Sequence, residues 1–376
     1  MAPSTYHDAD DDPGWDRAPA TRPRSLAMRI LHALLALSIV ATPLAWASTQ
    51  DGDHPERAPE VVDAKAEESA SPMQAWARMA GGEWRVTYPD GQKLVQTWNW
   101  GPGQHSMRIL SYRPDSLVEP PNGVHLLYWH PGRQEFVLKG LLANQRHMDG
   151  VMKIDGDQVE LTFQFHTDSD TLQMSERWTF DGADKFHETM YAHTDAGVSP
   201  VRESDYVRSK ELSPIAARTA KNAVQPSKAL HGLSALVGHS WEAKAEGDAG
   251  NSFAAETDFA WVPGSDAIYA HAYKPATETE ERSLQLDAYF YAHPRSKTLH
   301  YLALTTWGGV FEGDLRELPE GGIELIQKGF EGDQVTEYVE RLDFQKDGRL
   351  RDRVWRMKDG KLEPLLDILH SKIQAD

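Results

Sequence analysis

Two stretches of the chain read as copies of one another, and this repeat constrains the architecture more than any other feature. Residues 79–84 read MAGGEW and residues 98–103 read WNWGPG. Residues 236–241 read LVGHSW and residues 259–264 read FAWVPG. In each case an apolar residue, glycine and tryptophan precede an aromatic-x-Trp segment and a Pro-Gly turn. We interpret this pattern as a tandem duplication.

Later motifs repeat at a similar spacing. Trp241 follows Trp84 by 157 residues (241 − 84), and Glu340 follows Glu176 by 164 (340 − 176). A Ser-Lys pair at 209–210 is matched by one at 371–372, which is 162 residues later (371 − 209). A period of about 160 residues is too long for a solenoid repeat. It predicts two whole domains, as the length of 376 residues also does.

Within each copy the hydrophobic pattern is that of short strands. The segment 159–165 alternates apolar residues with polar ones, and Asp90-Gly91 is a hairpin turn signal. Many short strands separated by turn residues favour a barrel or sandwich over a parallel sheet. We therefore predict an all-β protein of two tandem antiparallel domains, each a barrel or a sandwich.

A short helix is expected before each barrel. Ser71 and Pro72 are typical helix-start residues, and Gly81 is a typical end. The expected apolar face comprises Met73, Trp76, Ala77 and Ala80 in the first copy, and Leu230, Leu233, Leu236 and Val237 in the second. Because Trp84 and Trp241 follow these helices directly, we expect each to close the base of its barrel.

The N-terminal region has the features of an export signal. Arg22, Arg24 and Arg29 precede an apolar run at 30–47 that ends in Ala-Trp-Ala, a small-x-small cleavage pattern. The expected organisation is an N-terminal extension and signal peptide at 1–47, a disordered acidic tether at 48–72, a first barrel at 73–210, a linker at 211–227 and a second barrel at 228–376.

An uncleaved membrane anchor is the alternative interpretation of the apolar run. The run has 18 residues and contains His32 and Pro43, whereas a spanning helix needs about 20 apolar residues. We therefore expect a periplasmic or secreted protein without stable membrane insertion after cleavage. Whether Met1 or Met28 is the true start stays open.

Composition excludes several function classes. The net charge of −18 argues against a nucleic-acid partner, because such binding relies on clustered Lys and Arg. The absence of cysteine excludes disulfides and thiolate chemistry. No HExxH, G-x-S-x-G, P-loop or dinucleotide fingerprint occurs. We therefore assign no catalytic residue, cofactor or metal ligand.

The Gly-x-x-Trp start after a short helix resembles the lipocalin-like barrels of the calycin superfamily. Each copy is similar to a bacterial domain family of unknown function within it, which also has a mid-domain Tyr-Asp-Pro turn and a Gly-rich strand, here 308–313. The turns at 128–131 and 291–294 depart from that motif, with an inserted residue and His in place of Asp. The resemblance covers nearly all of 73–210 and 228–372. It implies two tandem antiparallel lipocalin-like β-barrels, each preceded by a short helix, and no established activity.

Candidate binding residues come from the strands that should face the barrel interiors. Glu176 and Glu340 are in phase with apolar neighbours, and a carboxylate that faces a lumen must be paired or solvated. Each could orient a ligand, pair with a buried arginine, or lie outward past a bulge. With Trp98, Trp100 and Trp261, whose large rings suit apolar ligand sites, they are our candidate ligand-binding residues.

These observations lead to two hypotheses of function. In the first, the exported tandem barrels bind a small apolar or amphipathic ligand in a lumen and perform no catalysis. In the second, both lumens are packed and the protein is a structural or protein-interaction module of the cell envelope. An enzyme of unknown reaction is a third alternative. The ligand's identity, the copy that binds it and the oligomeric state are left open.

Export predicts a defined mature N-terminus. Cleavage after Ala47 leaves 329 residues (376 − 47) that begin at Ser48. Intact-mass analysis of the protein from its native host should give the mass of this form. A retained Met1 or Met28 would contradict the assignment to the periplasm or medium.

Overall fold

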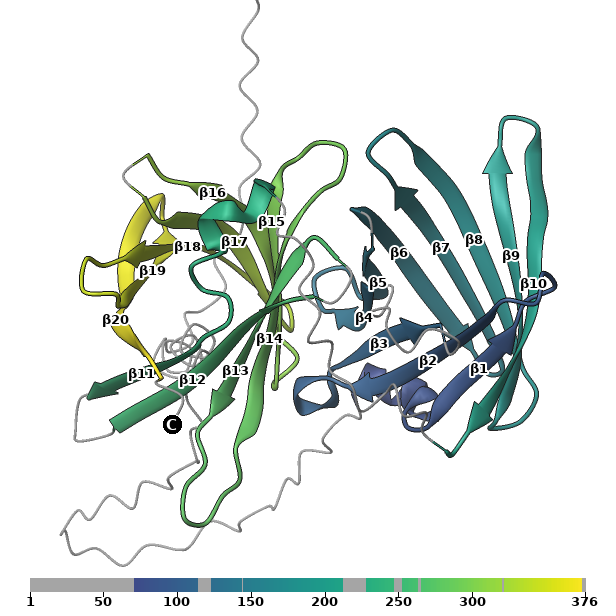
Figure 1. Ribbon diagram of the computed structural model, residues 1–376, viewed down its shortest axis with the longest axis horizontal. Coiled ribbons are helices and arrows are strands. Elements are labelled where there is room, and N and C mark those ends of the chain that lie inside the picture. The colour runs from purple at the N-terminus through teal and green to yellow at the C-terminus, as the bar shows by residue number, and fades with distance from the viewer. Residues whose placement is uncertain are drawn as a thin grey trace, which may run out of the picture.

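The computed structural model describes residues 71–113, 123–143, 145–211, 228–246, 252–262, 265–319 and 321–373. Over these residues the chain forms two closed antiparallel barrels of ten strands each, lying side by side (Figure 1). The prediction of two tandem antiparallel β-barrels is confirmed. The expected signal peptide and nearly all of the expected tether and linker lie outside the described residues.

In the first barrel each strand pairs with the next, and β1 pairs with β10 to close the cylinder. The strands are β1 (Glu83–Thr87), β2 (Lys93–Trp100), β3 (Ser106–Tyr112), β4 (Gly123–His130), β5 (Glu135–Leu142), β6 (Arg146–Asp155), β7 (Gln158–His166), β8 (Thr171–Phe180), β9 (Lys185–Thr194) and β10 (Gly197–Ser209). The Asp90-Gly91 turn joins β1 to β2, as its sequence predicts.

The second barrel has the same up-and-down order and closes by pairing β11 with β20. Its strands are β11 (Ser240–Glu246), β12 (Ser252–Trp261), β13 (Ala267–Lys274), β14 (Ser283–Ala292), β15 (Leu299–Thr305), β16 (Val310–Glu317), β17 (Ile323–Glu331), β18 (Gln334–Phe344), β19 (Leu350–Lys358) and β20 (Lys361–Lys372). Short 3₁₀-helices are η2 (Pro72–Met79), η3 (Pro102–Gln104) and η4 (Lys228–Leu233). Among the described residues, no helix has the length and apolar character needed to cross a membrane.

The register at barrel closure corrects one correspondence suggested by the sequence motifs. Trp84 lies opposite Arg208, and Trp241 lies opposite Lys372. The final strands therefore correspond at a spacing of 164 residues (372 − 208), whereas the Ser-Lys motifs give 162. Strand pairing sets the register, and a two-residue shift keeps each side chain on the same face. His370 thereby takes the position that Tyr206 has in the first barrel.

A 3₁₀-helix plugs the base of the first barrel. Met73, Trp76 and Met79 of η2 are buried, because a helix with three residues per turn aligns every third side chain. Of the expected face, Met73 and Trp76 are buried and Ala80 packs partly buried against the same cluster. The placement of Ala77 is wrong, because this residue is exposed and Met79 is buried instead.

The tryptophans that open the first strands pack against these plugs. Trp84 is fully buried and its Nε1 donates to the Met79 carbonyl oxygen at 3.1 Å. Trp241 is also fully buried and donates to the Leu236 carbonyl oxygen at 3.2 Å. The same contact at both bases ties each first strand to its plug.

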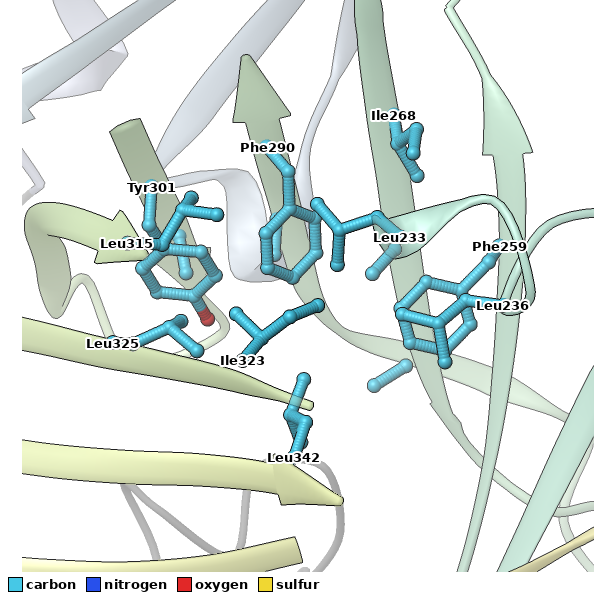
Figure 2. Close-up of a cluster of buried hydrophobic side chains, with 14 of the residues drawn as sticks. Leu233, Leu236, Phe259, Ile268, Phe290, Tyr301, Leu315, Ile323, Leu325 and Leu342 are labelled. Atoms are coloured by element: carbon cyan, nitrogen blue, oxygen red, sulfur yellow. The ribbon is translucent and has the colours of Figure 1, made fainter. Parts of the chain in front are cut away.

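The interior of the second barrel is filled by side chains from all sides. Figure 2 shows Phe259, Phe290 and Tyr301 pointing inward together with leucine and isoleucine side chains of other strands. Leu233 and Leu236, from the segment that precedes β11, reach the same cluster. This packing leaves little unfilled space in the described part of the barrel.

The two barrels also share a buried apolar contact between their outer walls. It joins β3–β5 of the first barrel to β13–β16 of the second (Figure 1). Its buried members are Val124, Leu126, Tyr128, Val137, Leu141, Val262, Ala267, Tyr289, Tyr291, Leu302, Leu304 and Val310. The continuous apolar cluster indicates that the barrels are docked, not merely tethered.

Gly103 shows why the Pro-Gly motif of the first copy matters. It adopts a φ of 58°, and a Cβ at this position would lie 2.0 Å from the carbonyl oxygen of Thr306 in the second barrel. Both the backbone conformation and the close approach therefore require glycine. The turn serves the contact between barrels.

The buried tryptophans predict large losses of stability on truncation. Trp84→Ala or Trp241→Ala should cost about 3–5 kcal/mol, a large share of the roughly 5–15 kcal/mol available to a domain. Thermal unfolding should show that each change mainly destabilises its own barrel. Trp307→Ala is the control, because that side chain is exposed and its loss should cost under about 1 kcal/mol. An unchanged melting temperature for either barrel would refute the role of its tryptophan in closing the base.

Candidate functional sites in the barrel interiors

Each barrel places two carboxyl groups on neighbouring strands of its inner face. In the first, Glu176 on β8 pairs with Met190, and Trp178 pairs with Glu188 on β9. In the second, Glu340 on β18 pairs with Val354, and Leu342 pairs with Asp352 on β19. The registers are the same, so each barrel has an inward acidic pair at the same height.

In the first barrel a buried ion pair neutralises one of the two acids. Arg202 of β10 donates to Glu188 at 2.7 Å, and its guanidinium lies 4.6 Å from the ring centre of Tyr88. The Trp178 indole donates to Glu176 at 3.0 Å. Burial and the nearby Glu188 charge raise the pKa of Glu176 to about 8, although Trp178 and Arg202 oppose the shift. This shift favours the protonated form of Glu176, which can donate a hydrogen bond.

The second barrel lacks this arginine and holds its acidic pair in a more enclosed site. Gln327 donates to Glu340 at 2.9 Å. His370 Nε2 lies 3.7 Å from Asp352 Oδ2. Burial and the Asp352 charge raise the pKa of Glu340 well above its usual value. A cavity of about 30 Å³ adjoins these groups, which is enough for one or two water molecules and no larger ligand.

The upper end of the first barrel is open where the second is filled. Inward-facing Leu172 is 51% exposed, and Met174 and Met190 are only partly buried. At the positions matching these two methionines, the second barrel has Tyr338 and Val354, each 1% exposed. The larger tyrosine fills space that methionine leaves accessible from the barrel mouth.

The candidate ligand-binding residues fall into both barrels. Trp98 is buried and packs edge-on against Trp178, with ring centres 6.0 Å apart. It therefore shares the first interior with Glu176, which Trp178 contacts directly. Trp100 is half-buried at the edge of the same cluster.

The candidates of the second barrel, Glu340 and Trp261, do not share one site. Glu340 lines the small cavity of the second barrel. Trp261 packs, partly buried, against the apolar cluster of that barrel. Among the described residues that line the cavity, Trp261 does not appear.

Sequence reasoning missed the partners of the two glutamates. Glu188 and Asp352 each lie between in-phase apolar residues, the same signal that identifies Glu176 and Glu340. That signal could have found them. Arg202 has no such signal, because its strand is polar on both faces near this point. His370 can be placed beside Asp352 only from the strand register, and the short Ser-Lys motifs give a register that is wrong by two residues.

Polar groups surround the apolar contact between the barrels. Arg108 of the first barrel lies 2.9 Å from His271, which lies 2.9 Å from Asp287. Arg133 donates to Glu312 across the interface at 2.9 Å. The Arg108–His271 hydrogen bond and the Arg133–Glu312 ion pair cross the interface and fix the orientation of one barrel on the other.

Three histidines also meet at this interface. His147 and His166 of the first barrel have ring centres 5.7 Å and 4.8 Å from that of His293 in the second. His147 is buried, and neither of its ring nitrogens has a hydrogen-bond partner among the described residues. Even so, within the part of the chain that the structure describes, no three His, Asp or Glu side chains are arranged to hold a metal ion.

Comparison with known proteins finds no family model that matches the chain and no curated protein with significant similarity to it.

The interface histidines predict that acid pH weakens docking. Burial, with smaller contributions from Lys139, His293 and His166, outweighs the attraction of Asp149 and lowers the pKa of His147 to about 3. A solvated imidazole has a pKa of about 6.5. Because the His147 pKa is lower in the docked state, His147 contributes to the docking free energy above pH 6.5, and this contribution is lost as the pH falls towards 3. The loss is about 2 kcal/mol at pH 5.

The measurement is urea-induced separation of the barrels, followed by energy transfer between dyes on two introduced cysteines. The natural chain has no cysteine to interfere. Separation should need less urea at pH 5 than at pH 7.5. His147→Phe, which cannot be protonated, should reduce this difference. Equal midpoints at both pH values in the unmodified chain would contradict the prediction.

Proposed function

We propose that the first barrel binds a small amphipathic molecule through its open end, and that the second barrel is a packed scaffold docked against it. The observation that carries the proposal is the contrast at matching positions. Met174 and Met190 line an accessible mouth, while Tyr338 and Val354 are buried. Interiors of larger barrels commonly hold ligands when side chains do not fill them.

The first interior suits a molecule with an apolar body and one polar end. Its floor is aromatic, because Trp178 contacts both Trp98 and Phe186. Above this floor lie protonated Glu176 and the Arg202 guanidinium. An apolar ligand body would replace water over the rings, and a carbonyl or hydroxyl end would accept from these donors. No catalytic step is needed for this role.

We further propose that the protein is an exported tandem duplicate of a lipocalin-like domain. The support is the apolar run at 30–47 with its cleavage pattern, together with the identical strand order and the matching acidic pairs of the two barrels.

A structural or protein-interaction module of the cell envelope is the second candidate. It is favoured by the filled interior of the second barrel and by the apolar cluster that docks the barrels. In that case the first lumen would be a packing defect without a ligand.

Filling the mouth of the first barrel tests the proposal. Met174→Tyr introduces the side chain found at the matching position 338, and should weaken binding of an apolar fluorescent dye by at least about tenfold, or about 1.4 kcal/mol. Arg177→Ala is the control, because this neighbour points outward and is exposed. Equal dye affinity in Met174→Tyr and the parent, or no dye binding by the folded parent, would favour the packed module instead.

A further inference from the structure

The largest cavity among those described lies between the barrels, outside both lumens. It has a volume of about 360 Å³, within the roughly 300–1,000 Å³ of small-molecule sites. Its walls are the outer faces of β4–β8 and, from the second barrel, Glu312 of β16. Small-molecule sites often form at such junctions between domains.

One end of the cavity carries an unsatisfied buried hydroxyl. Tyr128 lines the cavity and is 1% exposed, and its hydroxyl has no hydrogen-bond partner among the described residues. A buried hydroxyl without a partner is unfavourable by about 1–3 kcal/mol. A molecule in the adjoining space would supply the missing partner.

The charged groups of the cavity cancel in pairs. Lys139 lies 2.7 Å from Asp149 and also donates to Tyr291 at 3.0 Å. Arg133 lies 2.9 Å from Glu312. Two cations and two anions therefore line the cavity, and no excess charge selects an ionic ligand. An ammonium carries three donors, so Lys139 keeps one for a further acceptor.

The remaining wall is uncharged and partly apolar, with Val137, Gly150, Val151 and Phe163 among its residues. Thr162, Gln164 and Gln173 contribute a hydroxyl and two amides from the outer faces of β7 and β8. Such groups both donate and accept hydrogen bonds. The cavity thus presents donors and acceptors beside these apolar groups.

We propose that this cavity between the barrels binds a small neutral, hydroxyl-rich molecule of the monosaccharide class. Each hydroxyl both donates and accepts, so one molecule can satisfy Tyr128, Lys139 and the opposing carboxylates. A ligand with net charge would face Asp149 and Glu312, or Lys139 and Arg133, at close range. An apolar ligand would leave these groups desolvated and unpaired. The site is separate from the first lumen and does not depend on the function proposed for it.

Calorimetry and saturation-transfer NMR of the full mature chain test the proposal. The probes are glucose and galactose as neutral sugars, glucuronate as the anionic analogue and glucosamine as the cationic one. At least one neutral sugar should bind with a Kd of about 1 mM or below. Both charged analogues should bind at least about tenfold more weakly. Met174→Tyr, which fills the first lumen, should leave sugar binding unchanged.

Two substitutions locate the binding in the cavity. Tyr128→Phe removes the unsatisfied hydroxyl and keeps the ring, and Thr162→Val removes a lining hydroxyl. Each should raise the Kd by at least about fivefold. Thr179→Val is the matched control, because that threonine is exposed on β8 and bonds to Gln158 away from the cavity. The proposal is overturned if no neutral sugar binds, if a charged analogue binds best, or if Tyr128→Phe and Thr162→Val bind as the parent does.

Discussion

Closure of each sheet is the constraint on which the rest of the structure depends. Pairing β1 with β10, and β11 with β20, leaves no open edge at these strands. A closed ten-strand cylinder has an interior wider than an eight-strand one, so its ends and centre must be filled or hydrated. At the base, the barrels are filled by the tryptophan of each first strand and, in the first barrel, by the plug residues Met73, Trp76 and Met79. At the opposite end, side chains fill the second barrel more completely than the first.

The inward acidic pair shows what that difference means chemically. Two carboxyl groups within a barrel cannot both be charged at low energetic cost. In the first barrel Arg202 neutralises Glu188, and the mouth remains accessible above Glu176. In the second, Tyr338 fills the space and His370 lies beside Asp352 around a cavity of about 30 Å³. The first arrangement can bind a polar group that enters from solvent. The second encloses its carboxyl pair beside room for water, and both Asp352 carboxylate oxygens have no hydrogen-bond partner among the described residues. Docking of the barrels creates a third environment, which neither barrel has alone.

Local sequence signals predicted the strands but not the contacts between distant ones. Alternation at 159–165 and the Asp90-Gly91 turn identify strands and a hairpin, because these patterns depend only on neighbouring residues. The same alternation placed Glu176 and Glu340 on the inner faces. It could not identify Arg202 as the partner of Glu188, since that contact depends on the pairing of β9 with β10. The interface between the barrels was likewise out of reach, because its apolar strand faces look like ordinary core positions. The plug followed 3₁₀ spacing, which a helical period of 3.6 residues does not anticipate.

The central claim is that the first lumen is open to solvent and the base beneath it is closed. Oxidation of methionine by dilute peroxide, followed by mass spectrometry of the native protein, tests this directly, because sulfoxide formation requires access to the sulfur. Met174 and Met190, which face the open end, should oxidise quickly. Met107 and Met152, which are 0% and 2% exposed in the same barrel, should be protected. Equal protection of all four methionines would contradict the open lumen.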